Sequence, residues 1–582
     1  MSAVTMRDRQ QQVDGDEQRS PRAVLPNVVP LVGEQLAFDG ACRHDDEADR
    51  HRDAIGSQHQ PRESSRGPVE HHEAGSHRRA LEREEPGEQT DQRVRRCPDE
   101  TQPDGHAQHG SAPGPGYPRP VMADQASGAA LDVPDLAVEL GARFADAGHE
   151  LYLVGGSVRD LLLGRDVSDL DFATSAHPAE TTKVLHEWAD RRYFVGVRFG
   201  TVGALKDGTR LEITTFRQEV YAEQDRKPAV TFGRDIETDL GRRDFTINAM
   251  AVRLPEGELI DPNGGVQALG ARVLDTPMDP AIAFSDDPLR MIRAARFVAQ
   301  LDVVPAERVL EGIRTMRDRL DIVAVERMQA EIDKLLVAEH PAKGLSLLVD
   351  TGLADVFIPE LPALRLEQDP VHQHKDVLRH TYAVVERCEP DLVLRLAGLL
   401  HDIGKPKTRQ ITPEGVSFHH HEIVGARMAR ERLAALRYPN AIVDDVSTLI
   451  ELHLRFHGYG EGWTDAAVRR YVRDAGLLLD RLNQLTRADV TTRNADRARR
   501  FAALQDEHEE RIAALAEQEN LEAIRPSLDG RQVMERLGVS PGPIVGEAKA
   551  YLLEVRMERG PISEDEAYVL LDAWAKERGL AG

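Results

Sequence analysis

A pair of glycines and a pair of carboxylates lie close together in LVGGSVRDLLLGRDVSDLDF, residues 153–172. Gly155 and Gly156 allow the backbone to approach a ligand closely. The helix expected to follow them would point its free N–H groups at the same place, which suits a triphosphate. Arg159, on the first turn of that helix, can add charge-assisted contacts to phosphate. The stretch therefore predicts an anion site at a strand–turn–helix junction.

The carboxylates of Asp169 and Asp171 alternate along an expected strand and should share one of its faces. Two neighbouring acidic oxygens suit Mg²⁺, with substrate phosphates completing the coordination shell. Glu212, in RLEITTF, is a candidate third carboxylate. In a two-metal nucleotidyl transfer, one ion lowers the pKa of an attacking 3′-hydroxyl and the other neutralises the leaving pyrophosphate. The three acids are thus the candidate catalytic residues.

An α/β domain of about 140 residues is expected to position these groups, as judged from hydrophobic periodicity. A helix is expected at 136–148, a buried strand at 149–156, a short helix at 157–164 and a second strand at 167–174. A helix at 181–191 and a hairpin at 199–216 with its turn at Asp207-Gly208 complete this part. From about Asp286 onward nearly every segment has a helical period, so the predicted fold class is α+β, with a small mixed sheet followed by helical domains.

The composition excludes several classes of protein. No run of 18 apolar residues occurs, so no transmembrane helix is expected, and the absence of a signal pattern places the protein in the cytoplasm. Three cysteines without pairable spacing argue against a disulfide framework and a cysteine zinc site. The formal net charge of -25 does not decide whether RNA binds, because binding needs only a local basic surface.

Residues 1–122 differ in composition from the rest of the chain. They are rich in charged residues, Gln, His, Pro and Gly, contain no lysine, and include only two aromatic residues. Such a segment buries too little apolar surface to offset the entropy of ordering, so we predict a disordered extension. A further hypothesis is that Met122 is the true start.

The stretch GGSVRDLLLGRDVSDLDF resembles the signature of the polymerase-β-like nucleotidyltransferases of the CCA-adding and bacterial poly(A) polymerase family. RFGTV (198–202), RRDFTINAMA (242–251) and DDPLRMIRAARF (286–297) follow in the family's order, and the resemblance covers about residues 131–582. It implies template-independent addition of CCA to the 3′ end of tRNA from CTP and ATP. It also implies that Arg243 and Asp244 contact the incoming nucleotide. Arg242 and Asn248 belong to the same motif, and which of the two arginines acts stays open.

The same resemblance assigns base recognition to Asp287 and Arg290. At i and i+3 of an expected helix they should share a face. A carboxylate accepts and a guanidinium donates hydrogen bonds, which complements the Watson–Crick edges of cytosine and adenine. Uracil and guanine present a carbonyl and then an N–H, which is the reverse of the order on cytosine and adenine. Each buried polar group left unpaired then costs about 1–3 kcal/mol of free energy. The family usually has Glu before this pair, where this chain has Asp286. Arg293 and Arg296 are expected to continue the basic face and reach phosphates.

A second constellation of histidines and aspartates is similar to the HD-domain phosphohydrolases. Imidazole and carboxylate groups from separate helices can converge on one or two divalent ions, whose identity the sequence leaves open. Lys405 could hold a phosphate. The similarity implies phosphodiester or phosphatase chemistry on RNA ends or nucleotides. The expected core ligands are His380, His401, Asp402 and Asp489, with His421 and His453 as candidates for a second metal.

The expected organisation has five parts. These are the extension (1–122), a nucleotidyltransferase head (123–275), a helical neck that binds the base and RNA (276–365), an HD domain (366–500) and a helical RNA-binding tail (501–582). Alternatives to CCA addition are a poly(A) polymerase, an A-adding or CC-adding enzyme, and an HD-type phosphohydrolase whose head only binds RNA. tRNA, CTP and ATP are the expected partners, no membrane partner is expected, and the oligomeric state stays open.

Overall fold

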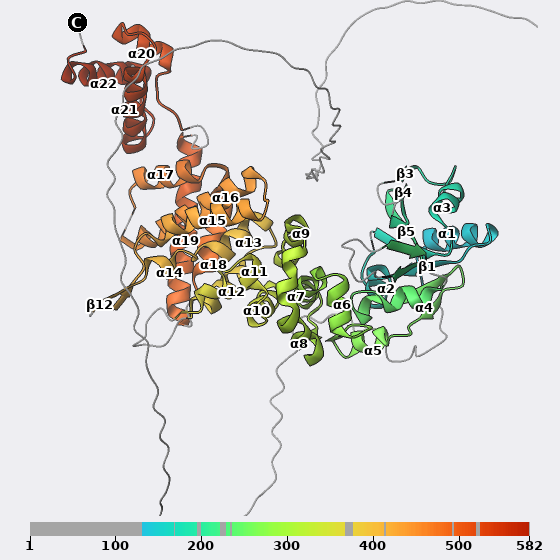
Figure 1. Cartoon of the computed structure of the whole chain (residues 1–582). Helices are drawn as coiled ribbons and strands as arrows, with labels where there is room; N and C mark the ends of the chain where they lie inside the picture. The colour runs from blue at the N-terminus through green and yellow to red at the C-terminus, as the bar shows by residue number, and fades with distance from the viewer. Residues whose placement is uncertain are drawn as a thin grey trace, which may run out of the picture. The chain divides into compact units, whose positions relative to one another are not determined.

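The computed structural model describes residues 131–167, 169–194, 199–220, 229–232, 235–366, 376–412, 415–461, 463–491, 494–519 and 524–580 (Figure 1). The predicted disordered extension lies outside the described residues. Among the described helices, none is long and apolar enough to span a membrane.

The head is built on a mixed seven-stranded sheet with the order β3-β4-β5-β2-β1-β8-β9. Strands β2 and β5 run parallel, whereas β1 pairs antiparallel with both β2 and β8. All four residues of β1 are buried, as expected for a central strand covered on both faces. The strands are β1 (Leu151–Val154), β2 (Asp169–Thr174), β3 (Arg191–Tyr193), β4 (Thr201–Lys206), β5 (Thr209–Thr215), β8 (Ala251–Leu254) and β9 (Glu258–Ile260). A separate two-stranded sheet pairs β6 (Arg217–Val220) with β7 (Ala229–Phe232).

Short helices accompany this sheet, namely α1 (Asp135–Asp146), α2 (Gly156–Leu162), α3 (Pro178–Val184), α4 (Ile236–Gly241) and α5 (Gly265–Gly270). The helix expected at 181–191 differs from α3, which begins earlier and ends at Val184. Its start is set by Pro178 at the first helical turn and by a capping box between His177 and Glu180. Glu187 has a φ of 65°, which is incompatible with a continuing right-handed helix.

The neck consists mainly of helices, as the sequence predicts. Its elements are β10 (Val273–Leu274), α6 (Pro280–Asp286), α7 (Leu289–Leu301), β11 (Val304–Pro305), α8 (Glu307–Met316), α9 (Val325–Leu336), α10 (Pro341–Asp350) and α11 (Ala354–Phe357). The helix expected over 286–297 is interrupted at its start. Asp287 has an extended backbone, with φ −142° and ψ 100°. Pro288 follows Asp287, and a steric clash with the proline ring disfavours the helical conformation of the residue before it. Asp287 therefore precedes α7 and does not share a helical face with Arg290.

Among the described residues after the neck, the secondary structure is helical except for a small hairpin of β12 (Gln410–Thr412) and β13 (Gly415–Ser417). The helices that follow the neck are α12 (Val377–Arg387), α13 (Leu392–Leu400), α14 (Lys405–Thr408), α15 (His421–Ala435), α16 (Asn440–Leu452), α17 (Asp465–Ala475), α18 (Leu479–Asp489) and α19 (Ala495–Glu519). The C-terminal helices α20 (Gly530–Leu537), α21 (Pro543–Arg559) and α22 (Glu564–Glu577) share a small hydrophobic core of their own, which includes Leu552 and Trp574.

Candidate active site and metal centre

Three carboxylates lie on two adjacent parallel strands of the head. Asp169 and Asp171 are exposed while Leu170 between them is buried, so both acids are on the same face of β2. Asp171 is in register with Glu212 of β5. The Ser157 hydroxyl fixes β2 beside α2, because it donates to the Asp169 carbonyl at 3.2 Å and accepts from the Asp171 N–H at 3.1 Å. The arrangement brings together the three acids that the sequence singled out.

The electrostatics of these acids are those of a cation site. Although its side chain reaches solvent, Asp171 lies in a concave surface where desolvation, then the Glu212 and Asp169 carboxylates, raise its pKa to about 6. The Arg243 guanidinium opposes this effect. Neighbouring carboxylates that repel one another match the oxygen donors preferred by Mg²⁺. The residues present therefore fit a divalent metal ion.

The glycine turn at the start of α2 is tightly enclosed. Gly155 has a φ of 71°, and a Cβ at this position would lie 3.0 Å from Nη1 of Arg243, so both its conformation and its surroundings favour glycine. Gly156 begins α2. Arg159, which the sequence predicts to contact phosphate, has two partners within the head: Nη1 donates to Oδ1 of Asn248 at 2.7 Å, and Nη2 pairs with Asp160 at 2.8 Å. Arg159 therefore contacts the RRDFTINAMA motif directly.

A pocket of about 360 Å³ opens beside the carboxylates. It combines two of the acids with a set of arginines, so that negative and positive groups converge on one space. The lining residues are Val154, Asp171, Phe172, Glu212, Thr214, Arg217, Arg242, Arg243, Asp244, Asp287, Arg290 and Arg293. Asp169 is on the same strand face but is not among them.

Asp239 organises the arginines of this pocket and was missed by the sequence reasoning. It is buried, and its carboxylate binds Arg242 at 2.7 Å and Arg243 at 3.1 Å. It also accepts from the Arg217 N–H at 3.2 Å. Burial alone would raise the pKa of Asp239, but the Arg243 and Arg242 guanidinium groups overcome this effect and lower it. The available signal was an acid three and four residues before two arginines, at the end of the short helix α4.

Asp244, Arg293 and Arg296 form an internal ion network instead of an open basic face. Nε of Arg293 donates to Asp244 at 2.9 Å, and Nη1 of Arg293 lies 3.3 Å from Glu331 of α9. Arg296 is buried and pairs with Glu331 at 2.6 Å. Desolvation, then Arg293, lower the pKa of Arg296 to about 10. Arg296, which the sequence predicts to reach phosphate, thus pairs with Glu331 in this structure, because packing of α7 against α9 buries its guanidinium.

Asp244 is likewise turned inward. Its carboxylate accepts from the Phe245 N–H at 2.8 Å and from the Asn248 amide at 3.1 Å. Burial opposes its ionisation, but Arg293 and these donors lower the pKa of Asp244 to about 2. Asp244 thus links the RRDFTINAMA motif to α7 through its contacts with Asn248 and Arg293.

Asp287 and Arg290 both line the pocket, although Asp287 lies before the helix that carries Arg290 and the two do not share a helical face. The Asp287 carboxylate pairs with Arg327 of α9 at 2.7 Å. The Arg290 guanidinium donates to the carbonyls of Arg242 at 2.7 Å and Ala283 at 3.3 Å. An acceptor and a donor therefore face the same pocket as the carboxylates of β2 and β5.

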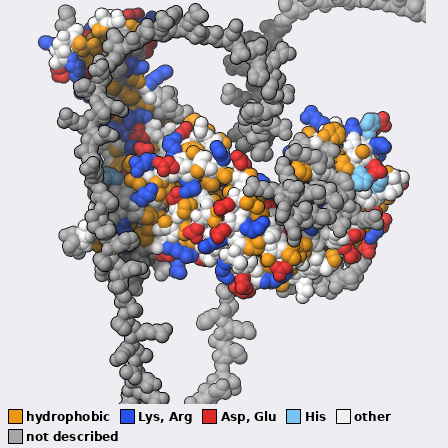
Figure 2. All heavy atoms as spheres, in the orientation of Figure 1, with side chains coloured by type: hydrophobic (Ala, Val, Ile, Leu, Met, Phe, Trp, Pro, Cys, Tyr) orange, Lys and Arg blue, Asp and Glu red, His pale blue; other side chains and the backbone are white. Residues whose placement is uncertain are grey.

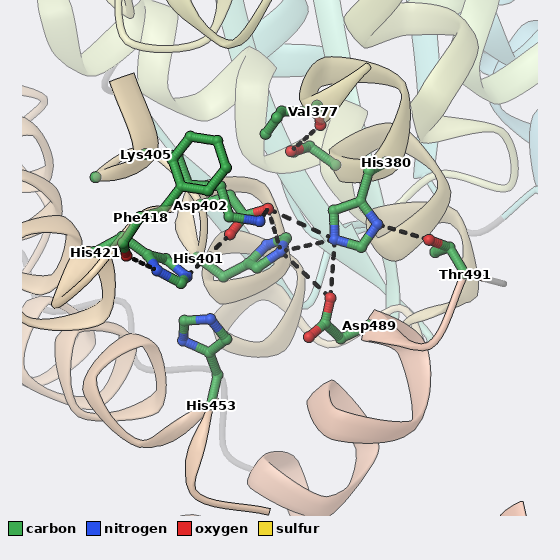
Figure 3. Close-up of polar contacts among 12 residues, drawn as sticks. Val377, His380, His401, Asp402, Lys405, Phe418, His421, His453, Asp489 and Thr491 are labelled. Atoms are coloured by element: carbon green, nitrogen blue, oxygen red, sulfur yellow. Dashed lines mark hydrogen bonds and ion pairs between the residues drawn. The ribbon is translucent and has the colours of Figure 1, made fainter. Parts of the chain in front are cut away.

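The histidine–aspartate constellation converges on one point among the helices, as Figure 3 shows. Nε2 of His380 is 2.8 Å from Asp489 and 3.2 Å from Nε2 of His401. Oδ2 of Asp402 lies 3.2 Å from His401, and Oδ1 lies 3.5 Å from Nε2 of His421. His380, His401 and Asp402 form one group with metal-ligand spacing, and Asp402, His421 and His453 form a second. Asp402 belongs to both.

The tautomers of these histidines suit metal ligation. Nδ1 of His401, His421 and His453 lies 2.8, 2.8 and 2.6 Å from the backbone carbonyls of residues 398, 418 and 450, respectively. A neutral ring that donates through Nδ1 has its lone pair on Nε2, which is the form that binds metals. Nε2 of His421 and of His453 is buried and has no hydrogen-bond partner among the described residues. Burial, then His401, lower the pKa of His453 to about 3, so this ring is neutral.

Lys405 lies at the edge of this centre, with its ammonium group 2.7 Å from Asp402. It also lines a pocket of about 650 Å³ together with Ser417, Phe418, His421 and Glu422. Of the second metal-ligand group, His421 thus lines this pocket.

Basic and acidic side chains are interspersed on the face of the molecule that Figure 2 shows. Over the helical part of the chain, the coloured, described side chains of neither kind gather into a single large patch in this view.

The fold and the two sites define a nucleotidyltransferase head joined to a helical HD domain. Models of the "poly A polymerase head domain", the "probable RNA and SrmB-binding site of polymerase A" and the "HD domain" match residues 151–275, 302–364 and 377–518. An A-adding tRNA nucleotidyltransferase from Deinococcus radiodurans is 35% identical over 444 residues, which are 73% of this chain and 95% of that protein. The chain belongs to the family of tRNA nucleotidyltransferases that includes the CCA-adding and A-adding enzymes.

Other relatives match shorter stretches of the sequence. A CCA-adding enzyme from Anoxybacillus flavithermus is 45% identical over 221 residues, 38% of this chain and 54% of that protein. The chain thus spans about half the length of the CCA-adding relatives that it matches in sequence. The crystal structure of the Bacillus stearothermophilus CCA-adding enzyme in complex with CTP superposes with a TM-score of 0.57 at 26% identity, covering 76% of this chain and 98% of that one.

Proposed function

We propose that the chain adds CCA to the 3′ end of tRNA, using CTP and ATP as substrates and releasing pyrophosphate. One observation carries the proposal: the pocket that contains Asp171 and Glu212 also contains the acceptor Asp287 and the donor Arg290. The groups that would hold the metal and those that would read the base therefore line one pocket. The similarity to CCA-adding enzymes supports the same reaction.

Asp169, Asp171 and Glu212 would hold the catalytic ions, and Mg²⁺ is the ion that their oxygen donors suit best. When bound, Mg²⁺ supplies activation of the RNA 3′-hydroxyl and neutralisation of the leaving pyrophosphate. The hydroxyl attacks the α-phosphate in line with the bond to pyrophosphate, which breaks as the new phosphodiester bond forms. Arg242 and Arg243, held by Asp239, place positive charge beside the triphosphate.

Base choice follows from hydrogen-bond complementarity. The Asp287 carboxylate accepts from the exocyclic amine of cytosine or adenine, and the Arg290 guanidinium donates to the adjacent ring nitrogen. Uracil or guanine would place a carbonyl against the carboxylate and an N–H against the guanidinium. The neck and the C-terminal helices would hold the tRNA through its shape and backbone.

The test uses tRNA transcripts that end at the discriminator base, with Mg²⁺ and with CTP and ATP supplied singly and together. Sequencing of the 3′ ends should show two C residues with CTP alone and a single terminal A once ATP is present. Long A tracts would instead identify a poly(A) polymerase.

A second candidate is an A-adding enzyme, because the relative that the chain covers over 95% of its length carries that activity. Transcripts ending in CC distinguish the two. Addition of A to those transcripts, without addition of C to transcripts that end at the discriminator base, would establish the A-adding function and refute the first proposal.

The HD centre supports an additional phosphohydrolase activity. Asp402 lies between two groups of histidines whose buried Nε2 atoms converge. Such a centre can hold one or two divalent ions, and its imidazole ligands favour transition metals. Release of phosphate from RNA 3′ ends or nucleotides in the presence of Mn²⁺, Ni²⁺ or Co²⁺ would demonstrate the activity, and no release with any of these ions would refute it.

A further inference from the structure

The acid that would read the base is held by a residue of a helix distant in the sequence. Asp287 lies before α7 with an extended backbone. Its Oδ1 accepts the Leu289 N–H at 3.2 Å, and its Oδ2 accepts from Nη2 of Arg327 at 2.7 Å. Arg327 lies on the first turn of α9, 40 residues further along the chain. The direction of the Asp287 carboxylate is thus set by α9.

Arg290 is held from a different side. Its guanidinium donates to the carbonyl of Arg242, which belongs to the head, and to that of Ala283 in α6. Both acceptors are neutral, so the charge of Arg290 is not neutralised by these contacts and further N–H groups remain for a base. The acceptor and the donor of the base-reading pair are therefore positioned independently.

The helix that carries Arg327 is itself firmly anchored. Glu331, one turn further along α9, is buried and pairs with Arg293 and Arg296 of α7. At the other end of α9, the buried Arg395 of α13 donates to the carbonyls of Leu336 and Ala338. Arg327 thus projects from a fixed helix although its own side chain is about half exposed.

We infer that Arg327 is a positioning residue for base selection, which holds the Asp287 carboxylate in one orientation, facing the amino group of cytosine or adenine. This inference rests on the proposed function of the pocket. A carboxylate accepts hydrogen bonds from an amino group, and a base that presents a carbonyl in that place leaves it unpaired. A carboxylate free to rotate away from the base would lose this contact, and discrimination against uracil and guanine would fall.

The experiment compares the wild-type chain with Arg327→Met and Arg327→Lys. The kcat/KM for CTP and for UTP is measured on transcripts ending at the discriminator base, and that for ATP and GTP on transcripts ending in CC. Arg327→Met should reduce the CTP-to-UTP and ATP-to-GTP ratios roughly fivefold, the upper range for a partly exposed ion pair. Arg327→Lys keeps the charge without the planar fork and should restore part of the lost selectivity.

Arg314→Met is the matched control, because Arg314 is also about half exposed, lies in the neck and pairs with Glu307 at 3.1 Å. Its selectivity should equal that of the wild type, and the melting temperatures of all three variants should stay close to that of the wild type. If the wild type selects C and A and Arg327→Met selects them equally well, the inference is overturned while the proposed function stands. If the wild type adds no nucleotide to either transcript, both are overturned together.

Discussion

Asp171 and Glu212 are paired in register across the parallel strands β2 and β5. Because adjacent parallel strands lie about 4.8 Å apart, two acids in register are close neighbours, and a third acid two residues along β2 shares their face.

Asp171→Asn and Glu212→Gln should each lower the rate of nucleotide incorporation. Asp171→Asn should lower it by about 10³-fold or more, because a lost metal ligand removes several kcal/mol of transition-state stabilisation. Primer-extension kinetics on tRNA transcripts measure the rate of incorporation.

Asp207→Asn is the control for this experiment, since Asp207 is an acid of the same hairpin at a turn with a φ of 49°, which asparagine also adopts. It should leave incorporation unchanged. Substantial activity in Asp171→Asn at saturating Mg²⁺ would refute the assignment of the metal ligands.

Asp239→Asn should raise the KM for CTP about tenfold and change kcat less. The charge of Asp239 holds Arg242 and Arg243 at the pocket, and a neutral amide would hold only one of them well. Glu237→Gln, an exposed acid on the same helix, is the control. Steady-state kinetics over a range of CTP concentrations separate the two constants, and an unchanged KM would contradict the role proposed for Asp239.

His453→Ala should remove one metal ion from the HD centre and leave nucleotidyl transfer intact. His453 contributes only to the group formed with Asp402 and His421. After equilibration with Mn²⁺ and removal of excess, elemental analysis should find about two ions in the wild type and about one in this variant. Asp402→Asn should lose both ions. His186→Ala, an exposed histidine of the head, serves as the control, and equal metal content in wild type and His453→Ala would argue against a two-ion centre.

Glu519→Ala should destabilise the junction between α19 and the C-terminal helices by about 3 kcal/mol, because it leaves two buried arginines without their acid. Glu519 pairs with Arg469 at 2.7 Å and with Arg556 at 2.9 Å, and all three side chains are less than a tenth exposed. Calorimetry and limited proteolysis measure the loss. Glu554→Ala, which breaks an exposed pair with Arg470 nearby, should cost no more than about 1 kcal/mol. Equal losses of stability in Glu519→Ala and Glu554→Ala would show that burial of Glu519 with its two arginines adds nothing to the stability of this junction.

The sequence by itself determined which residues share a local surface. The alternation of Asp169 and Asp171 about Leu170, the glycine turn before α2 and the hairpin turn at Asp207 depend on period-2 geometry and on glycine conformation, which act over a few residues. The histidines and aspartates of the HD centre could likewise be recognised from their types and order. Even the break at Asp287 had a local signal, because Pro288 restricts the residue before it.

Only the tertiary structure decided which charges neutralise one another. Arg293 and Arg296 look like an open basic face in the sequence, but Glu331, from another helix, lies against them. The partnership of Asp287 with Arg327 and the convergence of α12, α13, α15 and α18 on Asp402 also join positions far apart in the chain. The physical reason is that an ion pair depends on distance in space and on desolvation, and both are set by the packing of helices whose sequence spacing carries no record of which faces meet.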